Sequence, residues 1–443
     1  MIHHISVIGT GYLGVTHAAC LAELGHEVIG IDADPGKVAR LATGRPTFYE
    51  PGVAELLERH TTSGRLRFST DPEEAAAFAD IHFLCVGTPQ SPDGPAADTH
   101  FLMAAVDQLV PHLERPALVV GKSTVPAGTG HAIAERAAGL TRPGVDVEVA
   151  WNPEFLREGH AVQDTLRPDR IVVGVSSAEA EKVLRDVYRL LLDDGVPLVV
   201  SDVVTAELTK LSANAFLATK ISFVNAIADL CEAAGGDVVT LAEALGLDAR
   251  IGPRFLRAGL GFGGGCLPKD LRATVANADE LGASTTSALL REVDSVNQHC
   301  RARLVDVAVQ HCGGSLRARR VGVLGAAFKP GTDDVRDSPA LDVAVQLRAR
   351  GAHVSVYDPQ ANANAASVQP ALEYVDAMEE AVRDADLVLH LTEWPEFLEA
   401  DPAELLPLVC EPCIVDGRNA LDADRWRSAG WSYVGVGRSG TDG

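Results

Sequence analysis

A cysteine at the end of a glycine-rich stretch is the residue of this sequence best suited to covalent chemistry. Cys266 follows Gly259-Leu-Gly-Phe-Gly-Gly-Gly265, and Pro268-Lys269-Asp270 then leads into a helical pattern. A helix N-terminus and a nearby cation both lower the pKa of a thiol and raise its fraction of reactive thiolate. The pattern therefore predicts a nucleophile at Cys266, with a buried, unreactive thiol as the alternative. That alternative is what we expect for the other seven cysteines: Cys20, Cys85, Cys231, Cys300, Cys312, Cys410 and Cys413.

Polar side chains that could assist such a nucleophile occur at helical spacing. Asp270, at the start of the helical pattern after the cysteine, could act as a base or orient a water, or could be an ordinary carboxylate at a helix start. Lys210 and Asn214 are four residues apart in an apolar run and would share one helix face. They could form a polar site, and a solvated helix face is an equal alternative. Glu154 and Glu158 have the same spacing and indicate little in isolation.

A second motif indicates a dinucleotide. Gly9-Thr-Gly11-Tyr-Leu-Gly14 follows a strand-like run and opens a helical segment, and Asp32 ends the next strand-like run. In this context the glycines allow a tight turn, close approach of the backbone to a pyrophosphate, and close helix packing. A carboxylate at Asp32 accepts from a ribose 2′-hydroxyl and repels a 2′-phosphate, which favours NAD over NADP. The alternative is a structural glycine turn without a ligand.

The elements that must position these residues alternate along the chain. Strand-like runs are expected at Ile5–Ile8, Glu27–Ile31, Ile81–Val86, Ala117–Val120, Val147–Ala150, Ile171–Val173, Val321–Leu324, His353–Tyr357, Leu387–Leu391 and Cys413–Asp416. A long helix should run from about Thr205 to Ala234 and end at Gly235-Gly236. The fold class expected is α/β: two Rossmann-like α/β domains joined by a long central helix and a helical middle domain. Domains are predicted at residues 1–200, 201–312 and 313–443.

The second α/β series opens with Gly322-Val-Leu-Gly325-Ala-Ala-Phe-Lys329, which lacks the glycine spacing of the first. It could bind another part of a nucleotide or be a structural echo of the first domain, and the spacing favours neither.

Composition limits the partners and the compartment. The 443 residues carry 38 basic and 61 acidic side chains, a formal charge of -23, which argues against general affinity for nucleic acid or an anionic membrane. The eight cysteines lack the dense spacing of a disulfide framework or a zinc motif, and we expect no metal. No export signal is apparent, and the apolar runs considered are strand-sized, well short of a bilayer span. A cytoplasmic protein is predicted.

Together these segments resemble the UDP-glucose/GDP-mannose dehydrogenase family, and most closely its UDP-glucose 6-dehydrogenase branch, over nearly the whole chain. The motifs that carry the resemblance are Gly9-Thr-Gly-Tyr-Leu-Gly14, Val86-Gly-Thr-Pro89, Lys122-Ser-Thr-Val-Pro126, Asn152-Pro-Glu-Phe-Leu-Arg-Glu158, Lys210 through Asn225, Gly261-Phe-Gly-Gly-Gly-Cys-Leu-Pro-Lys-Asp270 and Phe328-Lys-Pro-Gly-Thr-Asp-Asp-Val-Arg336.

The resemblance implies a four-electron oxidation of UDP-glucose to UDP-glucuronate with NAD. One hydride leaves the primary alcohol, Cys266 adds to the aldehyde as a thiohemiacetal, a second hydride leaves to give a thioester, and water releases the acid. Lys210 and Asn214 would stabilise the oxyanion, and Asp270 with Thr124 would hold or activate water.

The resemblance also implies the binding residues. Glu158 would lie near the nicotinamide, and Glu154 would belong to the substrate or acid–base network. The residues implied for NAD are Gly9, Gly11, Tyr12, Leu13, Gly14, Asp32, Lys37, Thr88, Pro89, Ser123, Thr124, Glu158, Cys266, Lys269 and Arg336. Those implied for the sugar nucleotide are Glu154, Phe155, Leu156, Arg157, Lys210, Asn214, Arg250, Phe262, Gly263, Phe328, Lys329 and Arg418. Arg250 resembles an arginine that reaches a neighbouring subunit's site, which implies at least a homodimer built on the middle helices.

Two departures from the family pattern affect the substrate. Ala226 stands where many relatives have a glutamate, and the cysteine has a glycine before it and a leucine after it where a serine and an aromatic residue are common. The same chemistry on TDP-glucose or GDP-mannose is therefore an alternative. A two-electron hydroxyacid-type dehydrogenase and a non-enzymatic NAD-binding scaffold are alternatives from other classes.

Overall fold

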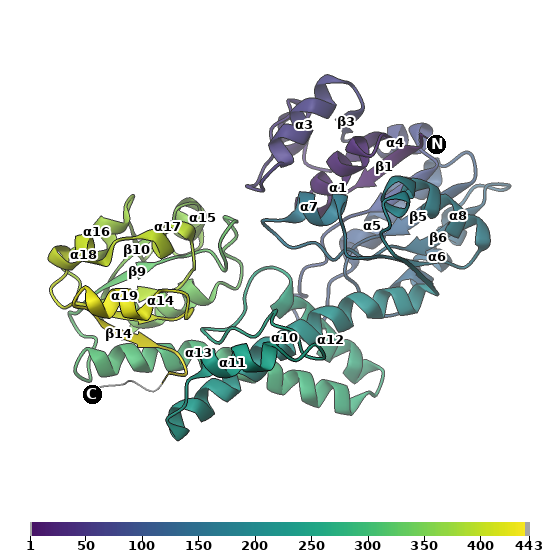
Figure 1. Ribbon diagram of the computed structural model, residues 1–443. Coiled ribbons are helices and arrows are strands. Elements are labelled where there is room, and N and C mark those ends of the chain that lie inside the picture. The colour runs from purple at the N-terminus through teal and green to yellow at the C-terminus, as the bar shows by residue number, and fades with distance from the viewer. Residues whose placement is uncertain (1, 439–443) are drawn as a thin grey trace. The chain divides into compact units, whose positions relative to one another are not determined.

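The structure of the protein is a computed structural model that describes residues 2–438. The chain divides into two compact units, Met1–Ala213 and Asn214–Gly443. Each unit contains one largely or wholly parallel sheet wrapped by helices (Figure 1). This confirms the predicted α/β class with two Rossmann-like domains. The three predicted domain ranges stay a prediction.

The first unit is built on an eight-stranded sheet of order β3-β2-β1-β4-β5-β6-β7-β8. All neighbours are parallel except β6 and β7. The strands are β1 His4–Ile8, β2 Glu27–Ile31, β3 Leu66–Ser69, β4 Ile81–Leu84, β5 Ala117–Gly121, β6 Val147–Trp151, β7 Ile171–Gly174 and β8 Leu198–Ser201. The helices are α1 Tyr12–Glu23, α2 Pro35–Ala42, α3 Val53–Thr62, α4 Pro72–Phe78, α5 His100–Leu109, η1 Val110–His112, α6 Thr129–Leu140, α7 Ala161–Leu166, α8 Ala178–Val187 and α9 Arg189–Asp193.

Both faces of this sheet are buried, because neighbouring residues of one strand enter different cores. In β2, Val28 packs in one core with Leu21 of α1, and Ile29 packs in the other with Leu102 of α5. Burial on both faces explains why these strands are continuous apolar runs. The carboxyl ends of parallel strands lie at one edge, where the segments after β1, β2, β4 and β5 begin.

The long helix α10, Val203–Ala234, starts in the first unit and runs into the second. Glu207, buried in its second turn, accepts hydrogen bonds from the amides of Gly128 and Gly130 at the start of α6, at 2.7 and 2.6 Å. The helix ends as predicted: Gly235 has φ +78°, and the amide of Gly236 donates to the Cys231 carbonyl at 2.7 Å.

By length and composition α10 is also the one helix in residues 2–438 that could cross a membrane, and 44% of its apolar window is buried inside the chain. The strand-sized runs considered from the sequence did not include it. Core helices of water-soluble proteins have the same length and composition.

The second unit combines the rest of this helix with a six-stranded parallel sheet of order β11-β10-β9-β12-β13-β14 and the helices that follow α10. The strands are β9 Arg320–Leu324, β10 His353–Tyr357, β11 Glu373–Tyr374, β12 Leu387–His390, β13 Cys413–Asp416 and β14 Ser432–Gly435. The helices are α11 Val238–Gly246, α12 Leu267–Glu280, α13 Ser284–His311, α14 Pro339–Ala349, α15 Asn362–Val368, α16 Met378–Val382, α17 Pro395–Glu399, α18 Pro402–Leu405, η2 Leu406–Leu408 and α19 Ala423–Ser428.

The second sheet repeats the strand order of the first, since both read third, second, first, fourth, fifth and sixth from one edge. The carboxylate after β10, Asp358, corresponds in position to Asp32 after β2. Asp358 is buried and accepts from the amides of Ala326 and Ala327 at 2.8 and 2.9 Å and from the Trp394 indole at 3.0 Å. Its Oδ2 therefore stabilises the turn after β9.

Candidate active site

The turn between β1 and α1 has the shape that a pyrophosphate requires. Gly9 has φ +90°, and a Cβ there would lie 2.9 Å from the backbone of Val86. A Cβ on Gly14 would lie 1.8 Å from the Gly9 carbonyl oxygen, so neither position accepts a side chain. Gly11, just before α1, has open space where its Cβ would be. The turn thus leaves a helix N-terminus accessible to an anion, as a bound dinucleotide needs.

The Asp32 carboxylate lies beside this turn and is fixed by several hydrogen bonds. Its Oδ2 accepts from the amide and the hydroxyl of Thr10 and from Lys37 Nζ, each at 2.9 Å, and its Oδ1 accepts from the amide of Asp34 at 3.1 Å. Burial alone would raise the pKa of Asp32, but the hydrogen bonds from Lys37 and the amides outweigh it and lower the pKa. The carboxylate therefore stays ionised at neutral pH, as a ribose acceptor should.

A buried glutamate that the sequence did not single out joins two of the predicted segments. Glu50 accepts from the Tyr12 hydroxyl and from the amides of Gly159 and Ala161, the latter two at 2.6 and 2.7 Å. It thereby links the first turn of α1 to the loop that carries Glu158, which is itself buried. The only sequence signal was one acid in a turn-forming Tyr-Glu-Pro-Gly segment.

The segments after β4 and β5 are also joined. The Thr88 hydroxyl donates to the Thr124 carbonyl at 2.7 Å, and the Ser123 hydroxyl donates to the Val86 carbonyl at 2.6 Å. Both hydroxyls are buried, whereas Pro89 next to them is exposed. Thr88, Ser123 and Thr124 therefore lie at the same edge of the sheet as the glycine turn.

Lys122 is a further buried residue that was not among the predicted site residues. Its Nζ donates to the Asn152 side-chain oxygen at 3.0 Å, and that oxygen also accepts from the Tyr188 hydroxyl at 2.5 Å. Burial lowers the pKa of Lys122 to about 8. This contact fixes the first residue of the Asn152–Glu158 loop.

Glu154 and Lys210 form a buried ion pair, with 2.9 Å between Oε1 and Nζ. The Lys210 ammonium also lies 5.7 Å from the centre of the Phe155 ring, and the amide of Leu156 donates to Glu154 Oε2 at 2.8 Å. Arg157 is instead paired in fork geometry with Asp164, at 2.9 and 2.7 Å. Lys210 thus belongs to a buried polar cluster of the first unit, which decides against the solvated helix face left open from the sequence.

In the second unit Cys266 is exposed and immediately precedes α12, as the sequence predicts. Asp270, in the first turn of α12, is buried and accepts from Asn214 Nδ2 at 2.7 Å. Its other oxygen lies 2.7 Å from Lys269 Nζ. A thiol, an amide, a carboxylate and an ammonium are therefore gathered at one helix N-terminus, as covalent catalysis on a carbonyl would require.

The other cysteines follow the prediction with one exception. Cys410 is exposed, so the expectation that it is buried is wrong. It precedes β13 in a loop whose turn-forming Glu411-Pro412 keeps it outside the core. Cys413 is half-buried, and Cys20, Cys85, Cys231, Cys300 and Cys312 are buried.

The three domain descriptions of one family match this chain in order. The NAD binding domain of the UDP-glucose/GDP-mannose dehydrogenase family matches residues 3–192, its central domain residues 204–299 and its UDP binding domain residues 322–423. The UDP-glucose 6-dehydrogenase of Rhizobium meliloti (strain 1021) is 41% identical over 98% of this chain and 99% of its own length. The chain belongs to this family. It is an NAD-dependent dehydrogenase with a sugar-nucleotide substrate.

Solved structures agree with the family assignment. A UDP-glucose dehydrogenase from Pyrobaculum islandicum has a TM-score of 0.92 at 41% identity and covers 99% of this chain and 98% of its own. A UDP-D-ManNAc dehydrogenase from Pyrococcus horikoshii has a TM-score of 0.86 at 28% identity and covers 98% and 99%. The overall fold is therefore shared by family members named for different sugars.

Within the second unit, residues 328–336 contact the loop that ends at Cys266 (residues 259–266, the cysteine loop). Residues 328–336 lie in the part that matches the family's UDP binding domain and are called the UDP-binding segment for that reason. The amide of Gly264 donates to the Arg336 carbonyl at 2.9 Å. A Cβ on Gly264 would lie 2.7 Å from the Phe328 ring, and one on Gly265 2.3 Å from the Arg336 guanidinium. Phe262 is buried in the helical core of this unit. Gly264, with φ +86° and the Phe328 ring where its Cβ would be, therefore has to be glycine for the loop to pack this closely against the 328–336 segment. The Arg336 guanidinium beside Gly265 is the end of a flexible side chain.

The predicted cations of this unit have different surroundings. Arg418 donates to the carbonyls of Gly261 and Phe328 at 3.1 and 3.0 Å, and so ties the cysteine loop to the UDP-binding segment. Arg336 donates hydrogen bonds from Nε and Nη2 to the Asp334 carboxylate. The Lys329 ammonium lies 5.5 Å from the centre of the Phe328 ring.

Arg250 is 88% exposed in its side chain and pairs with Asp248 two residues earlier. Its contacts in the chain are thus local ones.

The predicted site residues therefore fall into two groups. The first unit brings together the glycine turn with Tyr12 and Leu13, Asp32 with Lys37, the Thr88 and Ser123–Thr124 segments, and the 154–158 loop with Lys210. The second unit brings together Cys266, Asn214, Lys269 and Asp270 and packs Gly264 and Gly265 against the 328–336 segment. Phe262 lies in the helical core, and a Cβ on Gly263 would lie 2.3 Å from the Asp337 carbonyl oxygen. Within residues 2–438 no group of three or more His, Cys, Asp or Glu side chains could hold a metal ion.

Proposed function

We propose that this dehydrogenase oxidises UDP-glucose to UDP-glucuronate through a thioester on Cys266. The observation that carries the proposal is the exposed thiol at the start of α12, where the buried pair Asn214–Asp270 and the half-buried Lys269 also lie. Relatives named UDP-glucose 6-dehydrogenase, about 40% identical over nearly the full chain, support the substrate. In this proposal residues 1–200 bind NAD, residues 201–312 carry the cysteine loop, and residues 313–443 bind the nucleotide of the sugar.

The first oxidation removes a proton from the oxygen of the sugar's primary hydroxyl and a hydride from the carbon that carries this oxygen. The product is an aldehyde. NAD, when bound, supplies the hydride acceptor for both oxidations. In this proposal Glu154, which pairs with Lys210, takes part in the proton transfer, and Glu158 contacts the nicotinamide. Asp32 and the glycine turn hold the dinucleotide in place.

The second oxidation uses the cysteine. The Cys266 thiolate adds to the aldehyde carbon, and the ammonium of Lys210 and the amide of Asn214 stabilise the resulting oxyanion. Loss of a second hydride gives the thioester, and water then adds to its carbonyl, with Asp270 and Thr124 as the water-holding pair. The thiolate leaves with both C–S electrons, so one alcohol and one water yield one carboxylate, two hydrides and three protons.

We further propose a cytoplasmic homodimer formed through α10. Phe216, Phe223 and Leu230 are exposed and spaced seven residues apart, so they form one apolar stripe on this helix. The proposed contacts of the sugar nucleotide, besides the residues already named, are Phe155, Leu156, Arg157, Phe262, Gly263, Phe328, Lys329 and Arg418. Arg250, largely exposed in its own chain, is the residue proposed to reach the partner's site.

Initial rates with UDP-glucose, TDP-glucose and GDP-mannose, each with NAD, test the substrate. We expect UDP-glucose to give the highest kcat/KM, because the C-terminal domain matches the family's UDP binding domain. A higher kcat/KM with GDP-mannose or TDP-glucose would contradict the proposal. Full activity of Cys266→Ala would instead favour a two-electron dehydrogenase.

A further inference from the structure

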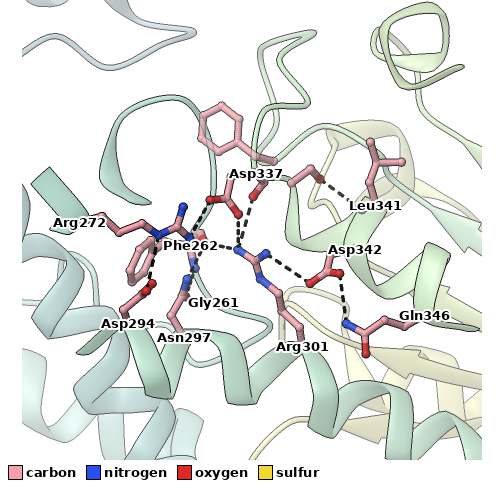
Figure 2. A network of polar contacts seen from close by, with 12 residues as sticks. Gly261, Phe262, Arg272, Asp294, Asn297, Arg301, Asp337, Leu341, Asp342 and Gln346 are labelled. Carbon is pink, nitrogen blue, oxygen red and sulfur yellow. Dashed lines mark hydrogen bonds and ion pairs between the residues drawn. The ribbon is translucent and has the colours of Figure 1, made fainter. Parts of the chain in front are cut away.

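A buried arginine on α13 lies at the centre of a polar network around the cysteine loop (Figure 2). The side chain of Arg301 is 5% exposed. Its Nη2 donates to the Phe262 carbonyl at 3.2 Å and to Asp337 Oδ1 at 3.0 Å, and its Nη1 donates to Asp342 Oδ2 at 3.3 Å. A guanidinium so deeply buried needs such partners, and here they come from three separate segments.

The cysteine loop is held at Phe262 from two successive turns of α13. Asn297 accepts from the Phe262 amide at 2.8 Å and donates to its carbonyl at 3.0 Å, and Arg301 donates to the same carbonyl. Gly261 has φ +85°, and a Cβ there would lie 2.2 Å from Asn297 Oδ1. The backbone four residues before Cys266 is therefore fixed by side chains of α13.

Asp337 connects this anchor to the helix that starts after Cys266. Its Oδ1 binds Arg301, and its Oδ2 lies 3.2 Å from Arg272 Nη2 on α12. Figure 2 shows the carboxylate between the two guanidinium groups. Asp337 has φ +47°, a conformation rare for a residue other than glycine, and follows Arg336 in the UDP-binding segment. One carboxylate thus joins that segment, α13 and α12.

We propose that Arg301, oriented by Asp337, is a positioning residue that keeps Cys266 at the N-terminus of α12. This inference rests on the proposed role of Cys266 as the nucleophile. Held there, the thiolate is stabilised by the helix dipole, and it meets the aldehyde in a fixed place. Lysine cannot replace Arg301, because three hydrogen bonds in fixed directions require a planar guanidinium.

The test compares Arg301→Lys with Arg303→Lys by alkylation of Cys266 with iodoacetamide across pH and by kcat with UDP-glucose. Arg303 lies on the same helix but pairs with Asp229 and Glu232, away from the cysteine loop. For Arg301→Lys we expect the midpoint of the alkylation profile to rise by about half to one pH unit and kcat to fall about tenfold or more. For Arg303→Lys we expect kcat to stay within about twofold of that of the wild type and the alkylation midpoint to stay at the wild-type pH.

A second pair of variants covers a failure of Arg301→Lys to fold. Asp337→Asn keeps the side-chain shape and should raise the alkylation midpoint, whereas Asp342→Asn, which touches Arg301 but neither Arg272 nor the loop, should leave it unchanged. Equal midpoints in Asp337→Asn, Asp342→Asn and the wild type would overturn the inference. Acid formation by Cys266→Ala would instead overturn the proposed function itself, so the two failures are distinguishable.

Discussion

Cys266 differs from the other cysteines in exposure and in its neighbours. Burial raises the pKa of Cys20, Cys85 and Cys300 to about 12 and that of Cys413 to about 11. At pH 8 a thiol with a pKa of about 12 is ionised to only about one part in ten thousand. Cys266 is instead exposed and immediately precedes α12, and a helix N-terminus favours a thiolate.

Limited alkylation at pH 7 should therefore label Cys266 first. We expect peptide mapping by mass spectrometry to find Cys266 modified before Cys410, the other exposed cysteine, and Cys20 and Cys85 unmodified in the folded protein. The Cys266 rate should rise with pH and level off below about 8.5, the ordinary pKa of a cysteine. Equal labelling of Cys266 and Cys410 at pH 7 would mean that the helix start does not activate the thiol.

Residue types and spacing predicted part of the site, and tertiary contacts decided the rest. The glycine turn and Asp32 were predictable because a strand, a turn and a helix follow directly in the sequence. The placement of Cys266 before α12 was also predictable. Glu50 was not, since its partners Tyr12 and Gly159 are distant in sequence and only the fold brings them together.

At the scale of elements, the predicted central strands are confirmed and the edge strands were missed. The four missed strands, β3, β8, β11 and β14, are the outermost strands of the two sheets. Central strands of a parallel sheet are buried on both faces and show as apolar runs. An edge strand such as β8 is partly exposed at Val199 and Val200 and lacks such a pattern.

The cysteine loop is the element most sensitive to a small change. Gly261→Ala would force a methyl group into Asn297 and a left-handed conformation on alanine. We expect a loss of about 1–3 kcal/mol of unfolding free energy and at least tenfold in kcat, measured by urea denaturation and NADH formation. Gly139→Ala in α6, where a Cβ meets nothing within 4 Å, is the control and should be neutral or stabilise by up to about 1 kcal/mol. Equal effects of the two substitutions would contradict the account of this loop.

At the scale of the molecule, the same strand order occurs in both sheets, but the carboxylate after the second strand has different contacts in each sheet. In the first sheet Asp32 accepts from Thr10 and Lys37, whereas in the second the corresponding Asp358 is buried among backbone amides and Trp394. The second α/β series lacks the glycine spacing of the first, and the sequence alone left its role open. The family's UDP binding domain matches the second series.

The exposed stripe of α10 predicts the oligomeric state. Phe216→Asp combined with Phe223→Asp should turn a dimer into a monomer, because it places charges in an apolar interface. Sedimentation velocity or light scattering measures the change, and Val368→Asp, an exposed apolar position on α15, should leave the dimer intact. A wild-type protein that is monomeric at micromolar concentration, or a double variant that stays dimeric, would contradict an interface on α10.

The most direct test of the central claim is the stoichiometry of the reaction. Purified protein with limiting UDP-glucose and excess NAD should form about two NADH and one UDP-glucuronate per UDP-glucose, because the thioester route includes two hydride transfers. Cys266→Ala should form no acid. One NADH per sugar in the wild type, or two NADH and the acid in Cys266→Ala, would contradict covalent catalysis by Cys266.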